Sequence, residues 1–147
     1  MSDLSVKQKR LARISTLQAI YALELKGSDP DTTYKHMLDK KDPPNDGALQ
    51  YSKHLCNLMV AHLSDIDSLI KNRSKNWNFN RITLMDKILL RVAIAEMLYV
   101  HDVPPKVSIT ECVEIAKQFS TEDSSSFING ILDSVYNDII INQEKML

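Results

Sequence analysis

Glycine and proline are scarce in this sequence, with only three glycines and five prolines among 147 residues. All-β folds need many turns, and these two residues build a large share of turns. No stretch alternates apolar and polar side chains as a half-buried strand does. These absences exclude a turn-rich β fold and favour long helices. A content of 44% hydrophobic and 25% charged residues is typical of one globular domain.

Cysteine is also rare, and long apolar runs are missing. Cys56 and Cys112 match no metal-ligand or redox spacing, so we expect two buried, reduced thiols. The N-terminus lacks the apolar core of a signal peptide, and no apolar run approaches the ~18 residues that span a bilayer. We therefore expect a cytoplasmic protein that does not associate with membranes.

Motifs for catalysis are missing as well. The sequence contains no Gly-rich phosphate loop and no nucleophile in a recognisable setting. His54 and His62 would lie roughly 12 Å apart along one helix axis, too far to share a metal ion. We expect His62 to be a hydrogen-bonded histidine at the edge of the core. The sequence thus predicts a protein that is not an enzyme and needs no metal or cofactor.

Apolar periodicity and capping signals predict an all-α chain of six helices. The first runs from about Ser5 to Lys26, with a capping box at Ser5 and Gln8 and a stop at Gly27. The second helix is expected at about 29–41, and the third follows a long apolar stripe over 51–69. The fourth is expected from 82 or 83 to about 101. The fifth should begin at a capping box of Ser108 and Glu111, and the sixth within 120–124.

The fourth of these helices has almost no polar face. Its apolar residues include Leu84, Met85, Ile88, Leu89, Val92, Ile94, Met97 and Leu98. A helix that is apolar nearly all round belongs in the centre of a bundle. The polar connection at 72–76 is the expected seam between an N-terminal half, about 1–75, and a C-terminal half, about 76–147, of a single domain.

Four cations gather near the N-terminus, although the net charge of the whole chain is −1. Lys7, Lys9, Arg10 and Arg13 recur at helical spacing and crowd one flank of the first two turns. Their mutual repulsion, and their position at the positive end of the helix dipole, indicate an anionic partner. A solvated basic tail is an equally good explanation of charge alone.

The start of the sixth helix contains an unusual group of side chains. Asp123, Phe127 and Gly130 share one row of the helix, and Gly130 costs roughly 0.8–1 kcal/mol relative to alanine. Phe127, with Asn129 and the hydroxyls of 124–126, could stack on an unpaired base and hydrogen-bond to it. The alternative is that Phe127 belongs to the core and Gly130 makes room for a crossing helix.

The order of these motifs resembles the NusB family of transcription antitermination factors. The resemblance covers nearly the whole chain. It rests on Arg13 and 17–21 in the first helix, and on Trp77, Arg81, Asp86, 88–91, Ala93, Glu96 and Met97. It continues through 104–107, 111–119 and 127–133. Thr16 stands where the family usually has alanine, and Thr110 where it usually has asparagine.

This resemblance implies an all-α fold of two packed three-helix halves. It also implies binding of boxA-type single-stranded RNA together with the ribosomal protein NusE, and action on RNA polymerase with other Nus factors, notably in ribosomal RNA synthesis. The RNA-contacting residues implied are Lys9, Arg10 and Arg13 for phosphates and Asp123, Ser124, Phe127 and Asn129 for bases. Tyr21 and Asp86 would lie toward the protein partner.

Two other functions are compatible with the residues. One is a scaffold domain of an RNA methyltransferase, which we do not expect because no cofactor-binding segment follows in this sequence. The other is a helical adaptor that binds only protein. The resemblance also leaves open a homodimer that buries the RNA-binding face.

Overall fold

The computed structural model describes residues 4–74 and 79–142, and these residues form helices without a strand. The predicted all-α fold is thus confirmed. The elements are α1 (Val6–Lys26), α2 (Pro30–Leu38), α3 (Asp46–Ala61), α4 (Leu63–Arg73), the 3-10 helix η1 (Phe79–Arg81), α5 (Leu84–Tyr99), α6 (Pro105–Phe119), α7 (Glu122–Val135) and the π-helix η2 (Tyr136–Ile141). Trp77 lies outside the described residues.

Local capping signals locate several helix ends correctly. The Ser5 hydroxyl accepts from the Gln8 amide at 3.1 Å, and Gly27 ends α1 with φ 65° in the left-handed region. A residue with a Cβ is strained in that conformation, which explains the glycine. Thr83 caps α5 and Thr121 caps α7 through their hydroxyls, as expected for helices that begin there.

The predicted third helix is wrong in one respect, because it is two helices. The helix is interrupted at His62, which has φ −116° and ψ 19° and separates α3 from α4. The His62 ring stacks on Tyr99 with centroids 3.8 Å apart and an interplanar angle of 14°. The apolar stripe keeps its periodicity across the break, so the sequence pattern alone gave no sign of it.

The predicted start of the fifth helix is also wrong. Helix α6 begins at Pro105, since proline is favoured in the first turn, where its missing N–H removes no hydrogen bond. Ser108 therefore lies inside α6 and is 1% exposed, so it cannot form a capping box with Glu111. Glu111 instead forms an ion pair with α1.

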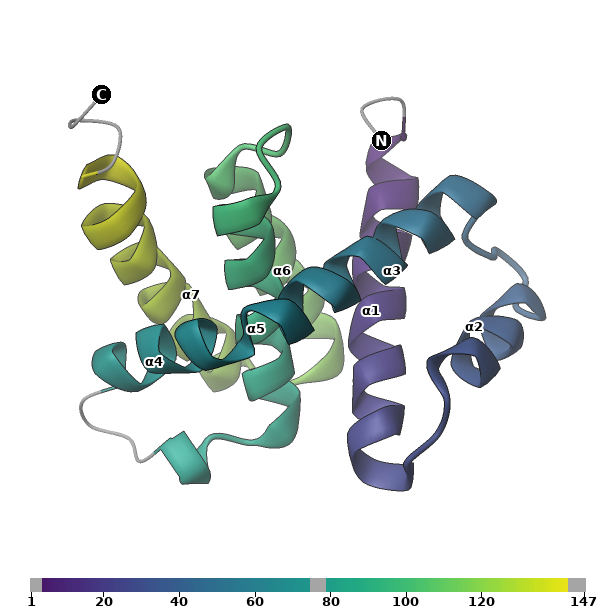
Figure 1. The fold of residues 1–147 in the computed structure, drawn as a ribbon, viewed down its shortest axis with the longest axis horizontal. Helices are drawn as coiled ribbons and strands as arrows, with labels where there is room; N and C mark the ends of the chain where they lie inside the picture. The colour runs from purple at the N-terminus through teal and green to yellow at the C-terminus, as the bar shows by residue number, and fades with distance from the viewer. Residues whose placement is uncertain (1–3, 75–78, 143–147) are drawn as a thin grey trace.

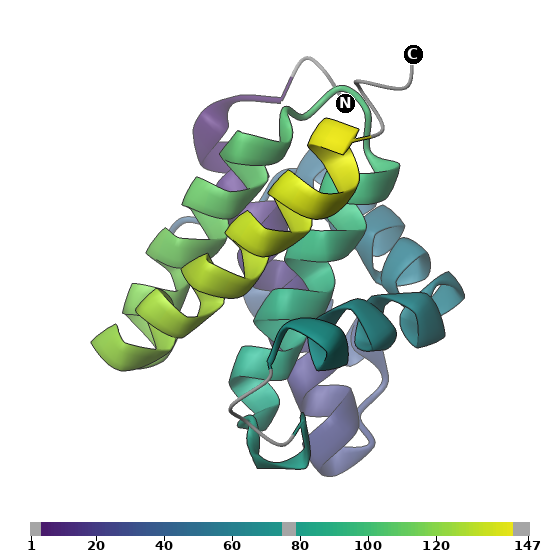
Figure 2. The same cartoon turned by 90° about the vertical axis from the view of Figure 1, so that its left-hand side faces the viewer.

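Helix α5 is the centre of the molecule, as its apolar surface predicted. It packs against α1, α3, α4, α6 and α7, and most of its residues are buried. Figure 1 shows α3 and α4 crossing in front of α5, with α1 and α2 on one side and α7 on the other. Figure 2 shows α6 and α7 lying side by side.

One apolar core runs through both predicted halves. It includes Leu17, Leu55, Ile66, Leu90 and Ile128, which come from five different helices. The division into halves near residue 75 remains a prediction, because residues 75–78 lie outside those described. Among the described helices, none is both long enough and apolar enough to cross a bilayer.

Candidate functional site

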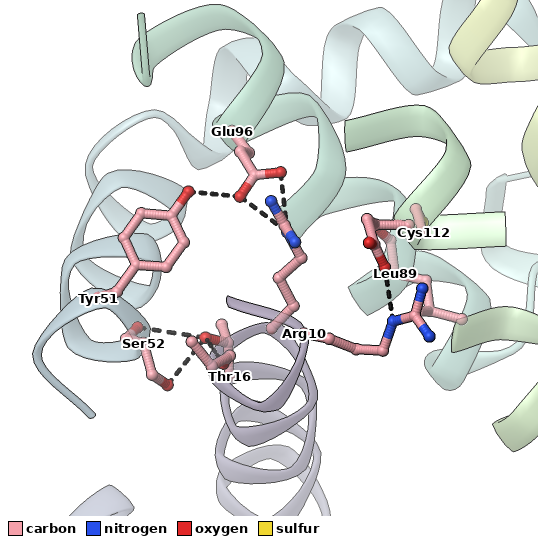
Figure 3. Close-up of polar contacts among 10 residues, drawn as sticks. Arg10, Thr16, Tyr51, Ser52, Leu89, Glu96 and Cys112 are labelled. Atoms are coloured by element: carbon pink, nitrogen blue, oxygen red, sulfur yellow. Dashed lines mark hydrogen bonds and ion pairs between the residues drawn. The ribbon is translucent and has the colours of Figure 1, made fainter. Parts of the chain in front are cut away.

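A buried carboxylate joins three helices near the N-terminal part of α1. Arg13 Nε of α1 donates to Glu96 Oε1 at 3.1 Å and to Oε2 at 3.0 Å, and Tyr51 Oη of α3 also donates to Glu96. Figure 3 shows Tyr51 and Glu96 facing each other across this contact. The Arg13 side chain is only 6% exposed. Arg13 is therefore buried in the core, and its role as a phosphate contact stays a prediction.

Arg10 lies one turn earlier and at the surface. Its Nε donates to Glu111 Oε2 of α6 at 2.8 Å, and its side chain is 47% exposed (Figure 3). The hydrogen bond and charge of Glu111 raise the pKa of Arg10. A guanidinium has five N–H donors, so Arg10 keeps donors for an outside anion while Glu111 holds its orientation.

The other N-terminal cations differ in their partners. Lys7 pairs with Asp42 at 2.7 Å, with both side chains 63% exposed. Lys9 is half-buried and has no ion-pair partner in the described part of the chain. Three of the four cations thus have carboxylate partners from distant segments, and the segment is a folded helix rather than a frayed basic tail.

Thr16 lies in the contact between α1 and α3 and not on the surface. Its side chain is fully buried, and its hydroxyl lies 2.8 Å from Ser52 Oγ, which in turn lies 3.0 Å from Tyr34 Oη. Figure 3 shows Thr16 beside Ser52. This departure from the family pattern therefore leaves the outer face of α1 unaffected.

A hollow of about 240 Å³ lies between α5 and α7. It is lined by Arg81, Ile82, Thr83, Asp86, Asp123, Ser124 and Phe127. Three predicted RNA-contacting residues and one predicted partner residue therefore come together there. Asp86 is 6% exposed and accepts a 3.1 Å hydrogen bond from Ser120 Oγ, which fixes its carboxylate at the hollow.

Asn129 lies on another flank of α7 than Phe127. It lines a separate open groove of about 400 Å³ with Thr110, Val113, Glu114, Lys117, Glu122, Ser125 and Ser126. Residues two apart on a helix point in different directions, which is why the sequence neighbours separate. Thr110, the second departure from the family pattern, lies in this groove.

Gly130 is exposed on α7, and a Cβ built on it would meet nothing within 4 Å among the described atoms. The alternative that Gly130 makes room for a crossing helix is therefore wrong. Phe127 is half-buried and packs against the core while it also lines the hollow, so its two interpretations coexist. Tyr21 is half-buried on α1 and packs against the same core.

Arg81 and Thr83 were not among the site residues predicted from the sequence. Both precede α5 and line the hollow with Phe127. Thr83 was recognised only as a helix start, and Arg81 only as part of a family pattern. Their role depends on α7 lying against the beginning of α5, a contact between segments about 40 residues apart that periodicity does not reveal.

Comparisons with known proteins agree with this fold. The family model described as the NusB family matches residues 10–137. The transcription antitermination protein NusB of Chloroherpeton thalassium is 41% identical over 131 residues, which are 89% of this chain and 62% of that relative. The NusB of Finegoldia magna is 39% identical over 127 residues, which are 86% of this chain and 92% of that relative.

A solved structure extends the likeness to three dimensions. The crystal structure of the antitermination factors NusB and NusE in complex with dsRNA contains a chain that matches 90% of this one. The match covers 98% of that chain, with a TM-score of 0.75 and 26% identity. Sequence and fold agree over most of the length, and this chain belongs to the NusB family.

Proposed function

We propose that this chain is a transcription antitermination factor that binds boxA-type single-stranded RNA together with a NusE ribosomal protein. The observation that carries the proposal is the hollow where Phe127 and Asp123 of α7 meet Asp86 of α5. Relatives named as antitermination proteins, and the NusB–NusE complex with RNA, support it. The role is binding rather than catalysis, and its place is the cytoplasm, beside RNA polymerase and other Nus factors.

The RNA contacts divide by chemistry. Lys9 and the free donors of Arg10 bind phosphates, which give affinity and salt dependence without sequence choice. Phe127 stacks on a base at the hollow, and Asp123 and Ser124 hydrogen-bond to its edge. Asn129 serves a second nucleotide at its own groove.

The protein partner lies close to the RNA in this proposal. Asp86 supplies a fixed carboxylate at the hollow, and Tyr21, half-buried on α1, supplies a second contact for the partner. Because Asp86 shares its hollow with Phe127, the NusE protein and the base at Phe127 would be neighbours. This arrangement accounts for joint binding, since each ligand completes a surface for the other.

One observation favours a second candidate, the protein-only adaptor. Three of the four N-terminal cations already have carboxylate partners, which reduces the charge available for phosphates. An adaptor of this kind would form a salt-insensitive complex with NusE and would not bind boxA RNA.

The substitution Phe127→Ala tests the proposed site. We expect it to weaken boxA RNA binding in the presence of NusE by roughly tenfold or more, since base–aromatic stacking contributes about 1–3 kcal/mol. Fluorescence anisotropy with labelled RNA measures the affinity. Phe119→Ala is the matched control, because Phe119 also packs half-buried against the core but does not line the hollow. Equal affinities of both folded variants would contradict the assignment.

A further inference from the structure

A second group of cations surrounds one aromatic ring on a surface that the proposed function does not use. The centroid of the Phe79 ring lies 4.9 Å from Lys71 Nζ, 4.6 Å from Lys87 Nζ and 5.9 Å from the guanidinium carbon of Arg91. All three distances are within the ~6 Å at which an aromatic ring attracts a cation. We call Phe79, Lys71, Lys87 and Arg91 the Phe79 patch.

Three elements build this patch. Lys71 belongs to α4, Phe79 to η1, and Lys87 and Arg91 lie one turn apart on α5. Arg91 is neutralised by Asp67 of α4, with Nε to Oδ1 at 2.8 Å and Nη2 to Oδ2 at 3.0 Å. This two-point pair is 12% and 18% exposed, so Arg91 mainly fixes α4 against α5.

The two lysines differ from Arg91 because their charges are not compensated. Neither Lys71 nor Lys87 has a carboxylate partner within residues 4–74 and 79–142. Both ammonium groups lie beside one ring, so they are at most about 10 Å apart, close to the Debye length at 0.1 M salt. Like charges so placed repel each other, and an anion close to both would relieve that repulsion.

The Phe79 ring also restricts the two lysine side chains before a ligand binds. A lysine normally has a flexible side chain, and ordering it costs conformational entropy. Phe79 attracts both ammonium groups before any anion arrives, which reduces the entropy lost on binding. A solvated surface lysine without such a ring lacks this advantage.

The patch and the hollow of Phe127 are linked by the short helix η1. Phe79 and Arg81 are the two ends of η1, and the Ile82 amide donates to the Phe79 carbonyl at 3.2 Å. Arg81 and Ile82 line the hollow with Phe127. In the proposal that follows, an RNA strand leaves the hollow past Arg81 and follows η1 toward the two lysines at Phe79.

We propose that the Phe79 patch binds the phosphate backbone of RNA that extends beyond the boxA element. This inference rests on the proposed RNA binding at Phe127. Ammonium groups attract phosphates without reading bases, so the patch would add affinity and salt dependence without changing sequence preference. RNA is favoured over a second protein surface because the uncompensated groups are two cations with no exposed apolar residue among them.

The test compares the double variant Lys71→Gln/Lys87→Gln with Lys35→Gln/Lys53→Gln. The control removes the same charge from α2 and α3, and its Lys53 also lies over an aromatic ring, 5.6 Å from the Tyr34 centroid. Anisotropy titrations with NusE across a salt series use a minimal boxA RNA and versions extended at either end. Circular dichroism and partner binding are measured for each variant.

We expect the patch variant to bind one extended RNA roughly tenfold more weakly than the unmodified protein. Its slope of log K against log salt should fall by about 1.4, because each phosphate that is no longer neutralised lowers the slope by about 0.7. Minimal boxA RNA and the control variant should show no change. An unchanged slope with extended RNA would overturn the patch but not the proposed function.

Two other outcomes would also overturn the inference. Loss of NusE binding by the patch variant, with RNA binding retained, would make the patch a protein interface. Absence of RNA binding by the unmodified protein would contradict both the proposed function and the patch. If the double variant is poorly folded, the single variant Lys71→Gln, at an exposed position, provides the same comparison with half the expected slope change.

Discussion

At the scale of single residues, Glu96 links three helices. It is 2% exposed and accepts hydrogen bonds from Arg13 of α1 and Tyr51 of α3 while it belongs to α5. A buried carboxylate is strongly destabilising unless partners satisfy it. The network therefore helps to select this arrangement of three helices, and it holds the helix that presents Arg10 to solvent.

The substitution Glu96→Gln should be strongly destabilising, because it leaves the buried Arg13 charge without a compensating partner. We expect the free energy of unfolding to fall by about 3–5 kcal/mol, measured by urea denaturation. Glu114→Gln is the control, since Glu114 forms only an exposed pair with Lys117 and should change stability by less than about 1 kcal/mol. Equal effects would contradict the assigned network.

One buried cysteine thiol and two buried tyrosine hydroxyls predict a loss of stability at alkaline pH. Burial raises the pKa of Cys112 to about 12 and raises the pKa values of Tyr34 and Tyr51 above the ordinary value. These groups ionise first in the unfolded chain, so their contribution is full below pH 9 and falls as pH rises toward 12. The urea midpoint of unfolding should be lower at pH 10.5 than at about pH 8. This decrease should be smaller in the variant Cys112→Ala. A flat profile would contradict this.

Sequence reasoning identified the important N-terminal cations but not their positions. The spacing of Arg10 and Arg13 showed that they share a helix flank, which is a local property. Their partners, Glu111 and Glu96, lie 101 and 83 residues away. A charge pattern does not reveal which cations meet distant carboxylates, so a core arginine and a surface arginine looked alike.

At the scale of elements, capping signals within one turn predicted helix ends well, whereas features that involve contacts between helices were not predicted. The hydroxyl cap at Ser5 and the stop at Gly27 act within one turn, so the sequence predicted them, and it also predicted a helix start at 82 or 83. The sequence did not predict the interruption at His62, whose ring stacks on Tyr99, a residue of another helix. The sequence predicted a helix start at Ser108, but α6 begins at Pro105.

Gly130→Ala should have opposite effects on folding and on binding. Gly130 is inside α7 with open space around it, so alanine should raise the free energy of unfolding by about 0.8–1 kcal/mol. If RNA approaches α7 closely there, the added methyl should also weaken boxA binding. Urea denaturation and RNA anisotropy measure the two effects. A gain in stability with unchanged affinity would show that RNA does not approach α7 closely at Gly130.

At the scale of the whole molecule, composition and periodicity were sufficient for the fold but not for the site. The apolar surface of 84–98 placed α5 in the centre correctly. Asp86 and Phe127 line the same hollow because of how α7 lies against the beginning of α5. Helix packing decides such contacts, and a single sequence contains no direct record of it.

The central claim is joint recognition of RNA by this chain and NusE. Its most direct measurement is the affinity of the unmodified protein for boxA RNA and for a scrambled RNA, with and without NusE, across a salt series. We predict tighter, boxA-selective binding when NusE is present, weakening as salt rises because phosphate contacts release counterions. An RNA that stays unbound in every condition, while the two proteins still associate, would contradict the account and support the protein-only adaptor.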